Sequence, residues 1–164
     1  MNISKKYRVL GIDPGLNITG YAVLDFAGAD VSIVEAGAIK PDKSGTLQNR
    51  IAHIYADVRE IIRDTKPETL AIEEIYSHYK HPKTSVIMAH ARGAIILAAE
   101  LCKIGVRNLP ATKVKKSLTG NGHATKMQIQ TAVQGFFKLP ELPTPADVAD
   151  AIAIALCAGR NVSV

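Results

Sequence analysis

Four acidic residues stand where a buried apolar residue would be expected, and together they suggest metal chemistry. Asp13 ends the apolar run VLGI, and Glu73 lies within LAIEEIY. Asp147 and Asp150 are three residues apart in ADVADAIAIAL and therefore share one helix face. Because these ligands are oxygen atoms, with no histidine or cysteine among them, they favour Mg²⁺ or Mn²⁺ over zinc. Two such ions bridged by Asp13 are typical of in-line attack on a phosphodiester, where one ion activates water and the other stabilises the leaving 3′-oxygen.

Each acid taken alone also has a structural interpretation. Asp13 could order the turn in its D-P-G sequence, and either Glu73 or Glu74 could end a strand in solvent. Asp147 lies in the first turn of the expected last helix, where a negative charge complements the helix dipole. Asp150 is harder to explain in this way because apolar residues surround it. The four acids together favour a shared cation, because clustered carboxylates repel one another unless a cation neutralises them.

Basic residues bracket a loop that contains two glycines, TGNGHA. They are Lys113, Lys115, Lys116, His123 and Lys126. The backbone amides of such a loop, with lysines on either side, suit contacts with phosphate groups. A solvated basic helix is the alternative, and composition alone favours it.

An aromatic residue, Tyr76, follows Glu73 by three residues, just beyond the expected strand end. An exposed ring at this position could stack on an unpaired base, an interaction of about 1–3 kcal/mol. A tyrosine that caps the core is the alternative. The next segment, SHYKHP, is rich in histidine, and we expect His78 and His81 to face DNA or solvent rather than a metal ion.

The spacing of apolar residues predicts an α/β fold that would bring these side chains together. Apolar alternation and β-forming residues predict strands at residues 7–12, 18–26, 31–39, 69–75 and 106–109. Helical spacing predicts helices at residues 46–64, 84–103, 111–118, 126–137 and 144–159. The first three strands are joined by short turns and are expected to be antiparallel, whereas the last two need crossover connections. We therefore expect a mixed five-stranded sheet with helices on both faces and ligands at its strand ends.

Length and composition fit a single globular domain over residues 1–164. The chain has 164 residues, of which 47% are hydrophobic and 21% charged, so it can bury a core. Its net charge of +5 favours an anionic partner such as nucleic acid. The N-terminus has no signal-peptide pattern, Glu100 and Lys103 close the longest apolar run, and the two cysteines have no metal-ligand spacing. We expect a cytoplasmic protein without a membrane segment.

The expected long helix at residues 84–103 is apolar on most of its surface. Its small residues include Ala89, Ala91, Gly93 and Ala94, which permit the close approach of another helix. Packing within one domain could cover all of this surface. A symmetric contact with a second copy of the chain is the alternative, and we favour it for part of the helix.

Five sequence blocks, in this order, resemble the RuvC family of bacterial Holliday junction resolvases. They are GIDPG-x4-GY-x-V, AIEEIY, the ARG that contains Arg92, KKSLTGNGHATK and ADVADAIAIAL, and they extend over residues 9–159. GIDPG-like turns recur across ribonuclease H-like proteins, whereas the whole set is specific. The segment between Tyr76 and Arg92 is about one residue longer than the family's usual segment and carries histidine and tyrosine where small or polar residues are more familiar.

The resemblance implies a ribonuclease H-like fold and a homodimer that cuts two opposing strands of a four-way DNA junction, leaving 5′-phosphates. It implies that two Mg²⁺ ions, with Mn²⁺ as a substitute, are held by catalytic carboxylates at Asp13, Glu73, Asp147 and Asp150. It also implies DNA contacts by Lys115 and Lys126, to which we add Lys113, Lys116, Arg92 and Tyr76. The RuvA–RuvB branch-migration complex is the expected protein partner.

Three other functions are compatible with parts of the sequence. A non-catalytic DNA-structure-binding protein could keep the same fold, and a general ribonuclease H could keep the same carboxylates. An ATPase of the actin and sugar-kinase type also begins with a glycine-flanked Asp turn, but it needs two such domains, roughly twice the ordinary domain size. Mg²⁺-dependent cutting of a four-way junction would separate a junction nuclease from a protein that only binds DNA.

Overall fold

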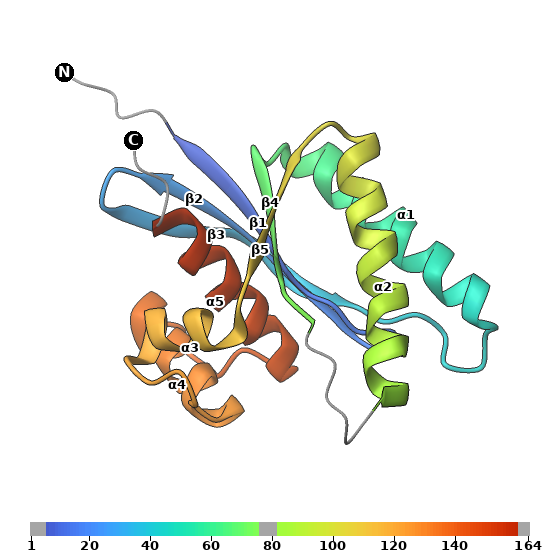
Figure 1. Ribbon diagram of the computed structural model, residues 1–164. Coiled ribbons are helices and arrows are strands. Elements are labelled where there is room, and N and C mark those ends of the chain that lie inside the picture. Colours follow the sequence, from blue (N-terminus) through green and yellow to red (C-terminus); the bar gives the residue numbers. More distant parts are fainter. Residues whose placement is uncertain (1–5, 76–81, 161–164) are drawn as a thin grey trace.

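The computed structural model describes residues 6–75 and 82–160 and contains one five-stranded sheet with the strand order β3-β2-β1-β4-β5 (Figure 1). The strands are β1 (Tyr7–Asp13), β2 (Thr19–Ala27), β3 (Asp30–Ile39), β4 (Thr69–Glu73) and β5 (Gly105–Leu109). The first three strands are antiparallel, whereas β4 is parallel to β1 and β5 is parallel to β4. The predicted mixed sheet is therefore confirmed.

Helices cover both faces of the sheet, as predicted (Figure 1). The helices are α1 (Leu47–Thr65), α2 (Pro82–Leu101), α3 (Ala111–Thr119), α4 (Lys126–Phe137) and α5 (Ala146–Arg160). Helices α1 and α2 pack on one face, and α5, flanked by α3 and α4, packs on the other. Successive residues of β1 are buried against opposite faces, so Val9 belongs to the α5 side and Leu10 to the α1–α2 side.

Some element ends differ from the predicted ends. Strand β4 ends at Glu73 rather than at residue 75, because its pairing partner β5 ends at Leu109, directly opposite Glu73. Helix α2 ends at Leu101, since Lys103 adopts a left-handed backbone conformation with φ of 61°. Helix α5 begins at Ala146, so Thr144 precedes the helix by two residues.

Helix α2 is, by length and composition, the one helix in the described parts of the chain that could cross a membrane. The residues expected to close the apolar run lie at the end of this 20-residue helix, which contains Glu100 and ends two residues before Lys103. Length and composition alone are weak evidence, since core helices of globular proteins meet the same criterion. Buried residues of α2 face the sheet and α1, which accounts for part of its apolar character.

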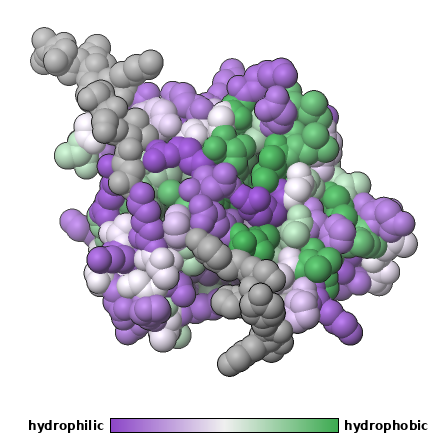
Figure 2. Space-filling model, in the orientation of Figure 1, coloured by the Kyte–Doolittle hydropathy of each residue, from purple (hydrophilic) through white to green (hydrophobic). Residues whose placement is uncertain are grey.

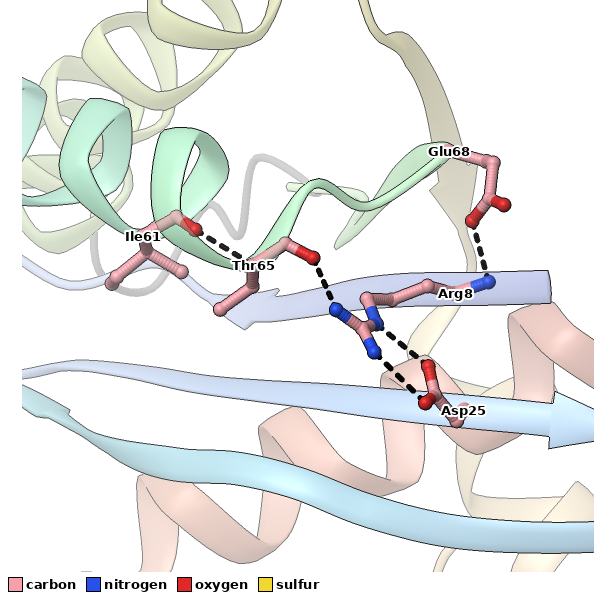
Figure 3. Close-up of polar contacts among 5 residues, drawn as sticks. All are labelled: Arg8, Asp25, Ile61, Thr65 and Glu68. Atoms are coloured by element: carbon pink, nitrogen blue, oxygen red, sulfur yellow. Dashed lines mark hydrogen bonds and ion pairs between the residues drawn. The ribbon is translucent and has the colours of Figure 1, made fainter. Parts of the chain in front are cut away.

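A polar cluster joins β1, β2 and the α1–β4 connection (Figure 3). The Arg8 guanidinium donates to both carboxylate oxygens of Asp25, at 2.6 and 2.9 Å, and also to the backbone carbonyl of Thr65. The backbone N–H of Arg8 donates to the Glu68 carboxylate at 2.6 Å. The cluster lies at the end of β1 opposite to Asp13, so it fixes the sheet far from the acidic residues.

Replacing Asp25 by Asn should destabilise the fold by about 2 kcal/mol at pH 7, because charge-assisted hydrogen bonds contribute about 1.5–3 kcal/mol. The Arg8 guanidinium lowers the pKa of Asp25, through the hydrogen bond first and the charge second. A lowered folded-state pKa stabilises the protein above the unfolded-state pKa, so the difference should shrink as pH falls below about 4. Urea unfolding of the wild type and of Asp25→Asn at pH 7 and pH 3 measures this difference in the free energy of unfolding.

The matched control is Asp64→Asn, which removes an ion pair with Arg63 whose side chains are 56% and 70% exposed. Exposed pairs contribute at most about 1 kcal/mol. Equal losses in the two variants would contradict the assigned role of the Arg8–Asp25 pair.

Candidate active site

The carboxylates of Asp13 and Glu73 come from the carboxyl ends of neighbouring parallel strands. Strands β1 and β4 pair with Ile12 opposite Ile72, so the next residue of each strand ends at the same edge of the sheet. Alternation along the strands directs both acids to the face covered by α5, because Ile12 and Ile72 belong to the α1–α2 core. The parallel register therefore brings together two acids that are 60 positions apart in the sequence.

Helix α5 reaches this edge because two glycines let it pack directly on the strands. A Cβ atom on Gly11 would lie 2.6 Å from the backbone nitrogen of Ala155. A Cβ atom on Gly20 would overlap the backbone carbonyl of Asp147 and lie 3.0 Å from the nitrogen of Val148. Neither glycine has room for a side chain, because backbone atoms of α5 lie where its Cβ atom would be. Gly20 therefore lets the first turn of α5 approach the sheet, and Gly11 lets the middle of the helix do so.

Asp13, Glu73 and Asp150 line one hollow of about 220 Å³ together with Lys115 and Lys126. The remaining lining residues are apolar: Met88, Val114, Ile129 and Ala153. Asp147 is not among the lining residues, although its charge acts on both Asp13 and Asp150. In residues 6–75 and 82–160, no three His, Cys, Asp or Glu side chains come close enough to hold a single metal ion as they are placed.

Burial and mutual repulsion make the hollow unfavourable for ionised carboxylates. Burial raises the pKa of Asp13 well above its usual range, and the charges of Asp150, Glu73 and Asp147 raise it further. Burial likewise raises the pKa of Glu73 and of Asp150, whereas Lys126 opposes the shift in all three acids. The site therefore favours any cation that can neutralise it.

Two short helices position the lysines. Helix α4 begins at Lys126 because Thr125 and Gln128 form a reciprocal capping box, with hydrogen bonds of 3.2 and 2.8 Å. Lys115 lies in α3, one residue after the buried Val114 that anchors this helix to the core. Lys113 and Lys116 are exposed on α3 and do not line the hollow.

The family model for crossover junction endodeoxyribonuclease RuvC matches residues 9–158. The chain belongs to the RuvC family. A crossover junction endodeoxyribonuclease RuvC from Rhodopirellula baltica is 47% identical over 149 residues, which are 91% of this chain and 84% of the relative. A second crossover junction endodeoxyribonuclease RuvC, from Nitrosomonas eutropha, is 40% identical over 153 residues, which are 93% of this chain and 84% of the relative.

Solved structures of RuvC proteins have the same fold. Thermus thermophilus RuvC in complex with a Holliday junction substrate superimposes with a TM-score of 0.84 at 32% identity, and the match covers 92% of each chain. The yeast mitochondrial Holliday junction resolvase Ydc2 matches at a TM-score of 0.64 and 13% identity over 92% of this chain and 78% of that one, which is evidence for the fold alone. The predicted family and the ribonuclease H-like fold are therefore confirmed.

The other residues predicted to contact DNA or solvent in this RuvC-family chain are Arg92, Tyr76, His78 and His81. Tyr76, His78 and His81 lie outside the described residues, so the predictions for them stay predictions. Arg92, on α2, hydrogen-bonds within the protein, to the backbone carbonyl of Glu73 and to the side chain of Asn108. Its predicted contact with DNA also stays a prediction.

The sequence did not indicate the apolar wall of the hollow. Met88 reaches it from α2 and Ile129 from α4, and neither stands next to an acidic residue in the sequence. Helical spacing marks Ile129 as a core residue, but it does not indicate that the core ends at a carboxylate site. The apolar wall matters chemically because it limits the water that can solvate the three acids.

Proposed function

We propose that this protein is a metal-dependent crossover junction endodeoxyribonuclease that resolves four-way DNA junctions in recombination and repair. The observation that carries the proposal is the hollow at the sheet edge, where Asp13, Glu73 and Asp150 meet Lys115 and Lys126 in a chain of the RuvC family. The Thermus thermophilus relative, similar over 92% of both chains, has been solved with a Holliday junction substrate. Family and site geometry thus support the same reaction.

The acids supply the oxygen ligands that hard divalent cations prefer, and we propose that Asp13, Glu73, Asp147 and Asp150 hold two Mg²⁺ ions, for which Mn²⁺ can substitute. Burial and repulsion raise the pKa values of three of these acids, and a dication would reverse that effect. When bound, such ions would supply an activated water for in-line attack and would stabilise the leaving 3′-oxygen, which would give a product with a 5′-phosphate.

The chain's own residues orient and neutralise the substrate. We propose that Lys115 and Lys126 face the phosphate at the cleaved bond, because both line the hollow and both lower the pKa of Glu73. Lysine ammonium groups there would stabilise the charge that develops in the transition state. The exposed Lys113 and Lys116 on α3 extend this basic surface, and Tyr76 would stack on an unpaired base.

Lys115→Ala and Lys126→Ala should each weaken junction binding. Each should also reduce the salt slope, which is the slope of log K for junction binding against the logarithm of the salt concentration, by about one, because each lysine releases roughly one counterion from DNA. Fluorescence anisotropy with a labelled junction in EDTA, at several salt concentrations, measures the slope without cleavage. The control is Arg63→Ala, which removes one exposed positive charge from the far end of α1. A lysine variant with an unchanged slope would not contact phosphate.

We propose that α2 also forms a homodimer contact. Val86, Leu97 and Leu101 are 58%, 52% and 55% exposed. They are eleven and four residues apart, so they lie along one side of the helix. Hydrophobic surface gathers over the region of α2 in the space-filling view (Figure 2). A symmetric contact along this stripe would cover apolar surface and give two active sites for two opposing strands.

Leu97→Glu should convert the dimer into monomers at micromolar concentration, because a symmetric contact would bury the introduced charge twice without a partner. Sedimentation velocity gives the molecular mass directly. Val34→Glu is the control, since Val34 is 44% exposed on β3, on a different part of the surface. A Leu97→Glu variant that remains dimeric would place the contact elsewhere.

We further propose that residues 1–164 form a single domain, that the protein acts in the cytoplasm, and that the RuvA–RuvB branch-migration complex is its partner. The single sheet with one core on each face supports the first of these. Membership of the RuvC family supports the proposed cytoplasmic location and the proposed RuvA–RuvB partner.

Cleavage of defined substrates tests the proposed function. The protein should cut a synthetic four-way junction in Mg²⁺ or Mn²⁺, at symmetric positions on opposing strands and with 5′-phosphate ends, and should leave matched linear duplex intact. Junction binding without cleavage in either metal would favour a non-catalytic DNA-binding protein. Faster cleavage of an RNA–DNA hybrid than of the junction would favour a general ribonuclease H.

A further inference from the structure

Arg92 joins helix α2 to the strand ends that carry the active site. Its Nε donates to the backbone carbonyl of Glu73 at 3.3 Å, and its Nη2 donates to Oδ1 of Asn108. Asn108 lies in β5 opposite Ile72, the residue that precedes Glu73. One half-buried guanidinium thus contacts the last residue of β4 and the second-last residue of β5.

The contact with Glu73 falls where the regular sheet stops. Strand β4 ends at this residue, and the next backbone N–H, that of Glu74, donates to the carbonyl of Leu109 at 2.9 Å. The peptide group between Glu73 and Glu74 is therefore held on both sides, by β5 through its N–H and by Arg92 through its carbonyl. Fixing this peptide fixes the direction in which the Glu73 side chain leaves the backbone.

We infer that Arg92 is a positioning residue for Glu73: it holds the main chain of Glu73 so that its carboxylate enters the hollow shared with Asp13 and Asp150. This inference rests on the proposed function, because it gives Glu73 a metal-binding role. Arg92 does not line the hollow and acts through the Glu73 backbone. Arginine suits this task because its planar group presents several donors in a fixed geometry to two acceptors at once.

The contacts of Arg92 separate this role from a DNA contact. Two of its five N–H groups donate to acceptors within the protein, so a phosphate contact through those same N–H groups would require breaking these bonds. A positioning role predicts a defect in metal binding with normal DNA binding. A phosphate contact predicts the opposite combination.

The test compares Arg92→Gln, Arg92→Lys and Asn108→Ala with the wild type. Mn²⁺ binding to the DNA-free protein, followed by the electron paramagnetic resonance of free Mn²⁺, should weaken about fivefold or more in Arg92→Gln. The Mg²⁺ concentration for half-maximal single-turnover cleavage should rise by a similar factor. Junction affinity in EDTA and its salt slope should stay within twofold of wild type. Arg92→Lys, which keeps the charge but not the paired geometry, should resemble Arg92→Gln, and Asn108→Ala should show the same defect more weakly.

Unchanged Mn²⁺ and Mg²⁺ dependence in Arg92→Gln would overturn the inference, and so would a salt slope reduced by about one with metal binding intact. Thermal unfolding checks that each variant folds. If Arg92→Gln does not fold, Asn108→Ala decides, and normal metal binding in that variant counts against the inference. Failure of the proposed function is a different result, namely a wild type that never cuts junctions or a Glu73→Gln variant that cuts normally.

Discussion

Asp13→Asn is expected to abolish junction cleavage while junction binding in EDTA stays within about twofold of wild type. Asp13 is influenced by all three other acids, since burial and the charges of Asp150, Glu73 and Asp147 all raise its pKa. Losing a shared ligand should remove several kcal/mol of transition-state stabilisation, and about 4 kcal/mol corresponds to roughly 10³-fold in rate. Single-turnover cleavage of a labelled junction in saturating Mg²⁺ measures the loss.

The same substitution should stabilise the metal-free protein. A carboxyl whose pKa is raised in the folded state binds its proton more tightly when folded, so folding becomes less favourable as pH rises above the unfolded-state pKa of about 4. Asp13→Asn removes this cost, and its melting temperature in EDTA should exceed that of wild type at pH 7 by more than at pH 4.5. In saturating Mg²⁺ the wild type should have the higher melting temperature, because only the wild type gains the full free energy of metal binding.

Asp25→Asn is the control for this pair of measurements, because Asp25 is an acid whose pKa is lowered by Arg8. Its substitution should lower the melting temperature at pH 7 and leave the Mg²⁺ effect unchanged. Normal cleavage by Asp13→Asn would remove the metal site from the proposed position, and a lower melting temperature in EDTA would contradict the repulsion among the acids.

Gly20→Ala is expected to impair folding and cleavage together. The added methyl group would overlap the backbone carbonyl of Asp147, in the first turn of α5. Backbone cannot move aside as a flexible side chain can, so the helix must shift, at a cost of about 1–3 kcal/mol or more. For a chain of this size, 2 kcal/mol lowers the melting temperature by about 4–8 °C. The shift should also move Asp147 and Asp150, and thus reduce cleavage well beyond what the lost stability explains.

The matched control is Gly135→Ala in α4, where an added Cβ atom would contact nothing within 4 Å. This substitution should stabilise the protein by about 0.4–1 kcal/mol and leave cleavage unchanged. Calorimetry and single-turnover cleavage below the unfolding transition separate the two effects. A stable Gly20→Ala variant would mean that α5 does not depend on this close approach.

The sequence was sufficient to predict the helices and strands and to identify the types of residue in the candidate site. The three antiparallel strands, the two later parallel strands and the five helices were predicted from apolar spacing, because that spacing follows the local geometry of strand and helix. Asp13, Glu73 and Asp150 were identifiable because an acid in an apolar stretch is conspicuous. The prediction that Asp13 and Glu73 meet needed only the rule that adjacent parallel strands end at one edge of the sheet, whereas Asp150 also requires that α5 packs against that edge.

The tertiary structure alone decided how those residues are held. The sequence does not indicate that Gly20 contacts Asp147, that Met88 and Ile129 wall the hollow, or that Arg92 bonds to the backbone of Glu73. It also did not indicate which of Asp147 and Asp150 binds metal more directly, and only Asp150 lines the hollow. Residue spacing encodes the period of one helix or strand, but contacts between elements depend on the register and distance at which those elements pack. Those quantities are set by the whole core at once.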